Sequence, residues 1–249
     1  MVTVHEISKF LDDELNIKEI EDSSNNGLQV ENVGEVKKVA FAVDASLAVF
    51  EKAVSSGCQM VVVHHGMIWE GIKYVTGNDY QRIKYLIDNN LAVYAAHLPL
   101  DMHPKHGNNI KLAKMLGLKH LEGFGEYKGS KIGFVGDYSG TLENVKKIMQ
   151  DNGMDTNCWS FGKQEIKKIA LISGGGLFSV KEAAECGVDL FITGDDSKYS
   201  AYAWAQELGL NVIIGGHYKT EVWGVQALME LVEKKFKVEV GFIDMPIPI

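Results

Sequence analysis

Continuous apolar runs alternate with amphipathic stretches in the first part of the chain. Residues 39–43 and 60–63 contain no polar residue, and this pattern predicts strands that are buried on both faces. Residues 46–56 place apolar side chains at helical spacing and predict a helix between these strands. Residues 79–90 and 91–96 predict a second helix and a third strand. Because strands and helices alternate, we expect parallel strands joined by right-handed crossovers.

The same order of elements recurs in the second part of the chain. Residues 36–41 match residues 166–171 at an offset of 130 positions, and residues 60–62 match residues 190–192 at the same offset. Two matches in the same order favour an internal duplication over a chance similarity. Each half is therefore predicted to run strand, helix, strand, helix and strand. Further helices are predicted for residues 108–116, 142–152, 197–207 and 222–235.

The predicted fold class is α/β, with two similar α/β lobes that arose by internal duplication. We expect residues 1–125 and about 220–249 to form the first lobe, and residues 126–219 to form the second. The Gly-rich segment 123–130 is predicted to mark the boundary between them. The last predicted strand, residues 237–242, is expected to pair with the first lobe, so that the lobes are interleaved in sequence.

Composition limits the classes of protein to which the chain can belong. Its 249 residues are 46% hydrophobic and 23% charged, as in ordinary globular proteins. A formal net charge of −8 argues against nonspecific nucleic-acid binding. No apolar run approaches the roughly 20 residues that span a bilayer, and the first residues lack the pattern of a signal peptide. We therefore expect a cytoplasmic protein without membrane contact, and three widely spaced cysteines fit such a reducing compartment.

Three apolar runs end at histidines, and two of them are followed by a carboxylate four residues later. In α/β proteins the loops at the carboxyl ends of strands open onto a crevice, where the chemistry takes place. A mixture of imidazole nitrogen and carboxylate oxygen suits Zn, Fe or Mn better than Ca. The sequence therefore predicts a metal site, and one for more than one ion. The candidate residues are His64, His65, His97, Asp101, His217 and Glu221.

Each candidate also has a plain structural interpretation. Neighbours at a strand end point to opposite sides, so His64 and His65 suit two metals, although they could equally be capping or core histidines. Gly66 after them permits a sharp turn and favours the ligand interpretation. Asp101 could cap a turn or the following helix. Glu221 could likewise act as a cap rather than as a ligand.

Two further features allow alternatives. Asp195 and Asp196 are interpreted as a further ligand, a general base or the cap of helix 197–207, and we favour the cap. The glycines 174–176 follow a strand where phosphate can bind, but the segment lacks the lysine of a P-loop, so a tight turn is favoured. For three aromatic residues, core packing is favoured over a base-stacking pocket; these are Trp69, Tyr74 and Trp159.

Five short motifs make the chain resemble the NIF-three-like dinuclear-metal proteins, also called GTP cyclohydrolase I type 2 homologues. The motifs lie at residues 26–31, 63–66, 96–101, 192–195 and 216–221, in the order of the family. The resemblance extends from about residue 22 to residue 242. It implies two divalent ions in the cleft between the lobes, and the donor types of the candidate residues suit Zn, Fe or Mn. It also implies that the ligands are His64, His65, Asp101, His217 and Glu221. His97 would lie beside them, either as a group that supports the ligands or as a catalytic proton shuttle.

The resemblance further implies a homohexameric ring and a metal-dependent hydrolase. The expected substrate is a nucleotide or a related heterocycle, attacked in a reaction of the GTP cyclohydrolase type. The alternative is a noncatalytic, metal-loaded ring that acts as a regulator or binding scaffold. The chain departs from the family pattern at Asp195, where a Glu is usual, and at Tyr199 and Ser200, where a His is common. These departures leave the implied metal ligands in place and concern the reaction.

Overall fold

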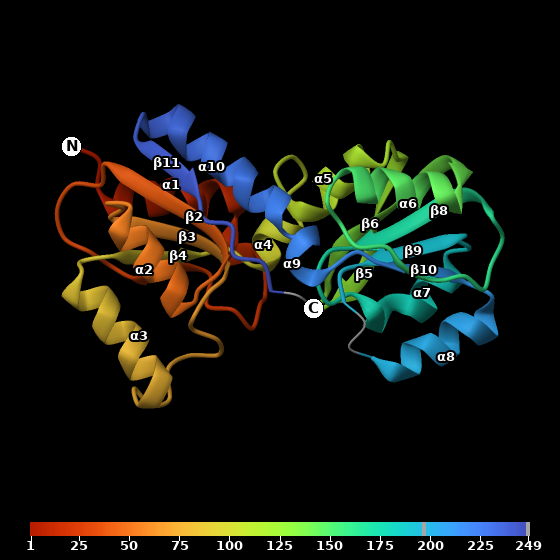
Figure 1. The fold of residues 1–249 in the computed structure, drawn as a ribbon, viewed down its shortest axis with the longest axis horizontal. Helices are drawn as coiled ribbons and strands as arrows, with labels where there is room; N and C mark the ends of the chain where they lie inside the picture. The colour runs from red at the N-terminus through yellow and green to blue at the C-terminus, as the bar shows by residue number, and fades with distance from the viewer. Residues whose placement is uncertain (196–197, 248–249) are drawn as a thin grey trace. The chain divides into compact units, whose positions relative to one another are not determined.

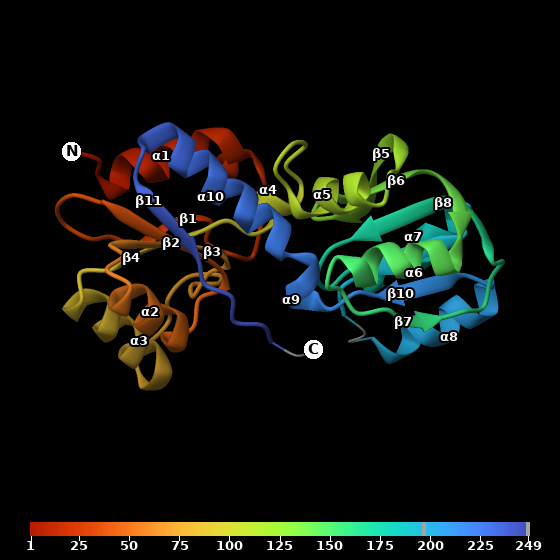
Figure 2. The ribbon, with the colours of Figure 1, turned by 45° about the horizontal axis from the view of Figure 1, so that its top comes forward.

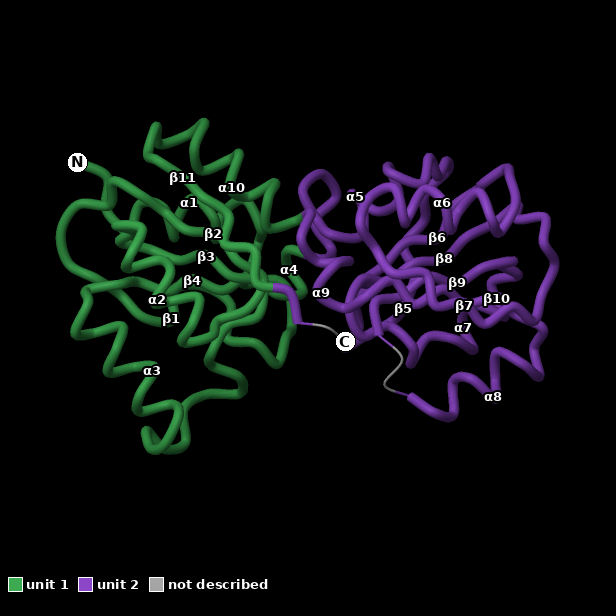
Figure 3. Tube along the Cα trace, viewed as in Figure 1, with its two compact units in different colours: residues 1–100, 224–245 green, residues 101–223, 246–249 purple. Residues whose placement is uncertain are grey.

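The protein divides into two compact units in a computed structural model that describes residues 1–195 and 198–247 (Figure 3). Unit 1 contains residues 1–100 and 224–245, and unit 2 contains residues 101–223 together with the described residues 246 and 247. The units interleave in sequence, and residues 101–125 fall in unit 2. Among the described residues, no helix combines the length and the apolarity that crossing a bilayer requires.

Unit 1 is built on a five-stranded sheet with the order β1-β4-β3-β2-β11 (Figure 1). Strand β1 runs antiparallel to β4, and the other neighbouring pairs are parallel. The pairing of β11 with β2 confirms that the end of the chain returns to the first part. The strands are β1 (Gly27–Val30), β2 (Lys38–Asp44), β3 (Met60–His65), β4 (Ala92–Ala95) and β11 (Glu239–Phe242).

Helices cover both faces of this sheet (Figure 2). On one face, helices α2 (Leu47–Ser55) and α3 (Gly77–Asp88) pack Phe50 and Leu86 against Val61 and Val63 of β3. On the other face, helices α1 (Val4–Leu15) and α10 (Val222–Phe236) meet through Phe10 and Phe236, whose ring centroids lie 5.5 Å apart. This burial on two faces explains why the central strands contain only apolar residues. The short elements of the unit are a 3-10 turn (Ile17–Glu19) and α4 (Leu98–Asp101), whose last residue begins unit 2.

Unit 2 contains a six-stranded sheet with the order β5-β6-β8-β9-β10-β7. Strands β8, β9 and β10 are parallel, whereas β5, β6 and β7 pair antiparallel with their neighbours. The expected parallel sheets are thus correct for the central strands of each unit and wrong for these outer ones. The strands are β5 (Lys119–Tyr127), β6 (Ser130–Thr141), β7 (Asn157–Trp159), β8 (Glu165–Ile172), β9 (Leu190–Thr193) and β10 (Asn211–Ile214).

Two helices bury one face of the unit 2 sheet. Helices α5 (Asn108–Met115) and α6 (Leu142–Asp151) pack Leu112 and Val145 into a core with Ile169 and Leu190. Helix α6 begins at Thr141, which forms a capping box with Asn144. The remaining helical elements are a 3-10 turn (Leu177–Ser179), α7 (Val180–Glu185), α8 (Tyr199–Leu208) and α9 (His217–Thr220).

The Gly-rich segment 123–130 is a hairpin and not a boundary between lobes. It forms the end of β5, a turn and the start of β6, which pair antiparallel. Gly125 has φ +76°, and an added Cβ would collide with the side chain of Ile172. Close packing against β8 therefore explains the glycine, and the predicted boundary is wrong.

The parallel strands of the two units share one register. Val39 of β2 lies opposite Met60 of β3, and Ile169 of β8 lies opposite Leu190 of β9. Both residues of the second pair lie 130 positions after those of the first, which is the offset found in the sequence. The matching register supports the internal duplication, which stays a prediction.

Candidate metal centre

Three histidines gather at the carboxyl ends of two neighbouring strands in unit 1. His64 and His65 end β3, and His97 follows β4, which is the parallel neighbour of β3. The ring centroids lie 4.6 Å apart for His64 and His65, 5.1 Å for His64 and His97, and 5.6 Å for His65 and His97. One nitrogen from each ring lies within 4.8 Å of the other two nitrogens. The strand ends therefore bring together three ligand atoms that one metal ion can bind.

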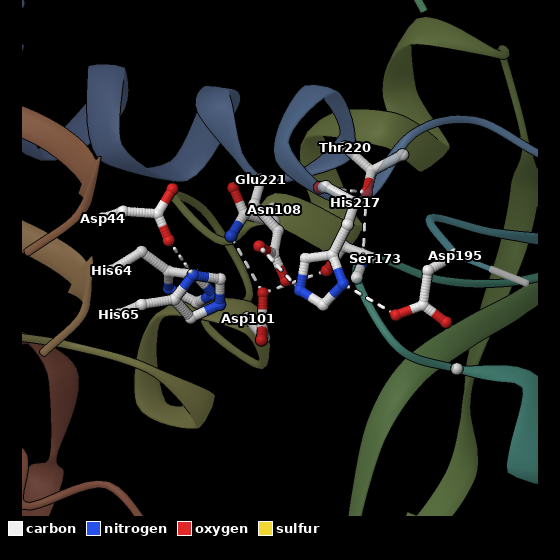
Figure 4. Close-up of polar contacts among 12 residues, drawn as sticks. Asp44, His64, His65, Asp101, Asn108, Ser173, Asp195, His217, Thr220 and Glu221 are labelled. Atoms are coloured by element: carbon white, nitrogen blue, oxygen red, sulfur yellow. Dashed lines mark hydrogen bonds and ion pairs between the residues drawn. The ribbon is translucent and has the colours of Figure 1, made fainter. Parts of the chain in front are cut away.

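The Nδ1 atom of each of these rings is already held by an oxygen acceptor. Nδ1 of His64 lies 2.9 Å from the carbonyl oxygen of Ala96. Nδ1 of His65 lies 2.8 Å from Oδ1 of Asp44 (Figure 4). A carbonyl oxygen can only accept, so the neutral ring of His64 carries its proton on Nδ1 and a lone pair on Nε2. Partners of this kind fix the tautomer and orientation of metal-binding histidines in proteins.

His97 is held by a buried carboxylate. Its Nδ1 lies 3.0 and 3.1 Å from the two carboxylate oxygens of Asp22, one of which also accepts from the backbone N–H of Leu98. Burial alone would raise the pKa of Asp22, but the hydrogen bond and the charge of His97, with hydrogen bonds from Asn26 and the backbone of Ser24, hold this pKa well below its usual range. Asp22 is therefore an anion, and its carboxylate orients the imidazole of His97.

Close packing against β4 and β1 explains why position 66 is a glycine. Its φ lies outside the left-handed region, so the sharp turn expected from the sequence is not the reason for the glycine. A Cβ at this position would lie 2.6 Å from Cβ of Ala95 and would collide with the amide of Gln29. The absence of a side chain lets the segment after His65 pass next to β4 and β1.

Unit 2 carries a histidine and a carboxylate of its own, His217 at the start of α9 (His217–Thr220) and Glu221 directly after it. Nε2 of His217 lies 3.4 Å from Oε2 of Glu221, and its Nδ1 lies 2.8 Å from Oδ2 of Asp195 (Figure 4). Burial alone would lower the pKa of His217, but the hydrogen bonds and charges of Asp195 and Glu221 outweigh it and raise this pKa to about 10. As for the histidines of unit 1, Nδ1 of the ring is held by an oxygen acceptor, and here Nε2 also faces a carboxylate.

Asp101, at the end of α4, is held by two donors from its own unit. Its Oδ1 accepts from Nδ2 of Asn108 at 2.8 Å and from the hydroxyl of Ser173 at 2.9 Å. One carboxylate oxygen of Asp101 lies within 4.8 Å of one from Glu221. The helix that follows, α5, has Gly107 at its N-cap and no side-chain cap, so Asp101 does not cap it. Two carboxylates this close are suited to sharing a cation, which offsets their mutual repulsion.

The segment Ser173–Gly176 is a tight turn, as favoured from the sequence. The backbone N–H groups of Ser173, Gly174 and Gly176 donate to the side chains of Asn109, Thr220 and Thr193. These three N–H groups already donate to acceptors inside the protein, so the turn does not present them to a phosphate group. The turn instead supports Asp101 through the Ser173 hydroxyl.

Two interpretations from the sequence are corrected by the structure. Helix α8 begins at Tyr199 after Lys198, so Asp195 is not its cap but the partner of His217, while Asp196 lies outside the described residues. Trp69 and Tyr74 are 40% and 80% exposed, so core packing is wrong for both. Trp159 is half-buried, and its ring centroid lies 5.1 Å from that of Tyr202.

Two residues of the site were not found by sequence reasoning. Asp44 directly follows the apolar run of β2, so the rule that located His64 and His97 at strand ends could have found it. Asp22 precedes β1 and lies 75 positions from His97 in the chain, and no local spacing links the two. Asp22 therefore needed the three-dimensional structure.

Comparison with known proteins places the chain among relatives along its whole length. The family model described as Duf34/NIF3 (NGG1p interacting factor 3) matches residues 2–248. A protein of Archaeoglobus fulgidus named GTP cyclohydrolase 1 type 2 homolog is 48% identical over 244 residues, or 97% of each chain. Two solved structures cover 100% of both chains: protein ybgI, described as of unknown function, is 33% identical with a TM-score of 0.92, and TTHA1606 from Thermus thermophilus is 34% identical with a TM-score of 0.90.

Proposed function

Since the chain belongs to the Duf34/NIF3 family, as its motifs predicted, we propose that it binds two divalent metal ions and uses them to hydrolyse a nucleotide or a related heterocycle. The observation that carries the metal proposal is the way in which hydrogen bonds orient the histidine rings. The four rings of His64, His65, His97 and His217 each have Nδ1 held by an oxygen acceptor. This is the arrangement by which proteins prepare Nε2 for a metal.

The ligands that we propose are those implied by the resemblance: His64, His65, Asp101, His217 and Glu221. Only Leu98, Pro99 and Leu100 separate His97 from Asp101, so the chain itself keeps His97 about one helical turn from the first carboxylate. The donor set combines imidazole with carboxylate, which suits Zn, Fe or Mn. The proximity of Asp101 and Glu221 supports two ions, because a carboxylate can bridge a pair of cations.

Bound divalent ions supply Lewis acidity and lower the pKa of water toward neutrality. The residues of the chain orient that chemistry and move protons. We propose that His97 accepts a proton at Nε2, because its Nδ1 is fixed by Asp22 and the imidazolium so formed is stabilised by that carboxylate. Asn108 and Ser173 hold Asp101 in place. The substrate class rests on the names of relatives, which are called GTP cyclohydrolase 1 type 2 homologs.

Elemental mass spectrometry on protein purified without chelator or nickel resin tests the metal proposal. We expect about two ions per chain in the wild type and a sharp fall in Asp101→Asn, which keeps the shape of the side chain but removes its charge. Asp137→Asn is the matched control, because Asp137 is exposed and its carboxylate lies 2.8 Å from the exposed ring of His120. Wild-type metal content in Asp101→Asn would contradict the assignment of this ligand.

Turnover is tested separately on the metal-loaded protein with GTP. Release of product that depends on added Mn, Fe or Zn and is lost in Asp101→Asn would support the hydrolase. Two ions per chain without turnover of GTP or other nucleotides would instead favour the alternative expected from the sequence, a noncatalytic metal-loaded regulator or scaffold.

A further inference from the structure

An exposed tryptophan lies directly beside the histidines of unit 1. The ring centroid of Trp69 is 5.0 Å from that of His97 and 6.4 Å from that of His65. Its indole N–H donates to the carbonyl oxygen of Gly66 at 2.8 Å, so the polar atom of the ring is satisfied within its own loop. The side chain nevertheless remains 40% exposed. We call residues 66–76, which carry this side chain, the Trp69 loop.

The start of the Trp69 loop is held rigidly by the segment before β1 and by β1 itself. The side-chain oxygen of Gln29 accepts from the backbone N–H groups of Met67 and Ile68, and its amide donates to the carbonyl oxygen of Ile68. Asn25 accepts from the backbone N–H of Gly71, and an isolated antiparallel bridge joins Trp69 to Ser24. These contacts fix the backbone around Trp69, so the exposure of its side chain is a feature of the folded loop.

The Trp69 loop also borders a cavity. A hollow of about 430 Å³ is lined by residues of this loop and of α3, a volume within the range of small-molecule sites. Its aromatic and apolar walls come from Trp69, Ile72 and Tyr74, and Lys73 and Glu70 supply charged groups at the same cavity. Large apolar side chains exposed together mark a binding surface more often than a structural need.

We infer that this cavity is the subsite for the planar heteroaromatic ring of the substrate, with Trp69 as the residue that stacks on it. The inference rests on the proposed function, since it names the part of the substrate that the metal-dependent reaction acts on. Trp69 itself lies 5.0 Å by ring centroid from His97, the residue proposed to accept a proton, and so connects this cavity with the reacting groups. Because every nucleobase has a π-face, stacking on a rigid aromatic side chain binds the ring without depending on the pattern of its hydrogen-bonding edge.

Calorimetric titration of the protein with GMP and with ribose 5-phosphate tests the inference. The two probes share the sugar and the phosphate and differ in the heteroaromatic ring. We expect GMP to bind more tightly than ribose 5-phosphate, and Trp69→Leu to weaken GMP roughly 5- to 150-fold, as for the loss of one stacked base. Trp69→Phe keeps an aromatic face and should restore most of the affinity, while ribose 5-phosphate should respond to neither variant.

Trp204→Leu is the matched control. Trp204 is 39% exposed, lies on α8 in unit 2, and its ring faces the ammonium group of Lys181. Unchanged GMP affinity in Trp69→Leu would overturn the inference, and so would equal affinities of the wild type for the two probes or no binding of GMP to it. Metal content measured on the same samples separates the two proposals. A wild type that holds no metal but binds GMP in a way that depends on Trp69 refutes the metal site alone. A wild type with two ions per chain whose GMP affinity does not depend on Trp69 refutes the subsite alone.

Discussion

A methyl group at position 174 is predicted to weaken metal binding while the protein stays folded. Gly174 has φ +59°, and a Cβ on its backbone would collide with Oε1 of Glu221 and lie 3.0 Å from Nε2 of His217. The backbone of the turn is held by the hydroxyl of Thr220, which accepts from the N–H of Gly174, and by Thr193, which donates to its carbonyl oxygen. The flexible carboxylate therefore moves rather than the turn.

The substitution Gly174→Ala has two separable consequences. The left-handed conformation costs an alanine about 1–2 kcal/mol of folding free energy. Displacement of the Glu221 carboxylate acts on the metal, and we expect an affinity loss of at least about 10–100-fold, the effect known for disturbing a group that orients a ligand. Gly187→Ala isolates the first consequence, because Gly187 has φ +66° and no atom within 4 Å of an added Cβ.

Urea unfolding and competition with a chromogenic chelator measure the two effects on the same samples. Both variants should lose a similar free energy of unfolding, and only Gly174→Ala should lose metal affinity. If Gly174→Ala binds metal as tightly as Gly187→Ala, the carboxylate of Glu221 does not hold the ion, and the reasoning from the turn is refuted.

Two other predictions concern the partner of His217 and the assembly. Asp195→Asn should weaken metal binding about 10–100-fold, because Asp195 orients the imidazole of His217. Asp155→Asn should not weaken it, because Asp155 is an exposed partner of Lys219. Equal metal affinities of the two variants in the chelator competition would argue against His217 as a ligand. Light scattering should give six times the chain mass of 27.5 kDa if the ring implied by the resemblance forms, and a monomer mass would rule it out.

Apolar runs predicted the central strands well because these strands are buried on both faces. The predicted strand at residues 39–43 is β2 (Lys38–Asp44), and that at residues 60–63 is β3 (Met60–His65). The outer strands β5 and β6 were missed, because they mix exposed and buried positions without regular alternation. Helix α1 was also missed, although Thr3 and Glu6 form a capping box that could have revealed its start.

The candidate site was predictable where neighbouring strands end together. Parallel strands β3 and β4 place His64 and His97 at one edge of the sheet, and this follows from the order of elements alone. The role of Asp195 was not predictable, because a carboxylate before a helix is more often a cap. Only the position of His217, 22 residues further along the chain, shows that Asp195 holds an imidazole instead.

The segment 22–29 links the two functional proposals in one physical arrangement. It binds the His97 region on one side and the Trp69 loop on the other, so the proton-accepting ring and the stacking ring are positioned by the same short piece of chain. Fixing both from one segment keeps the distance between them constant, and such pre-organisation lowers the entropic cost of reaching a reactive geometry. This explains the two amides of the motif at residues 26–31, because Asn26 accepts from the backbone N–H of His97 and Gln29 accepts from that of Met67.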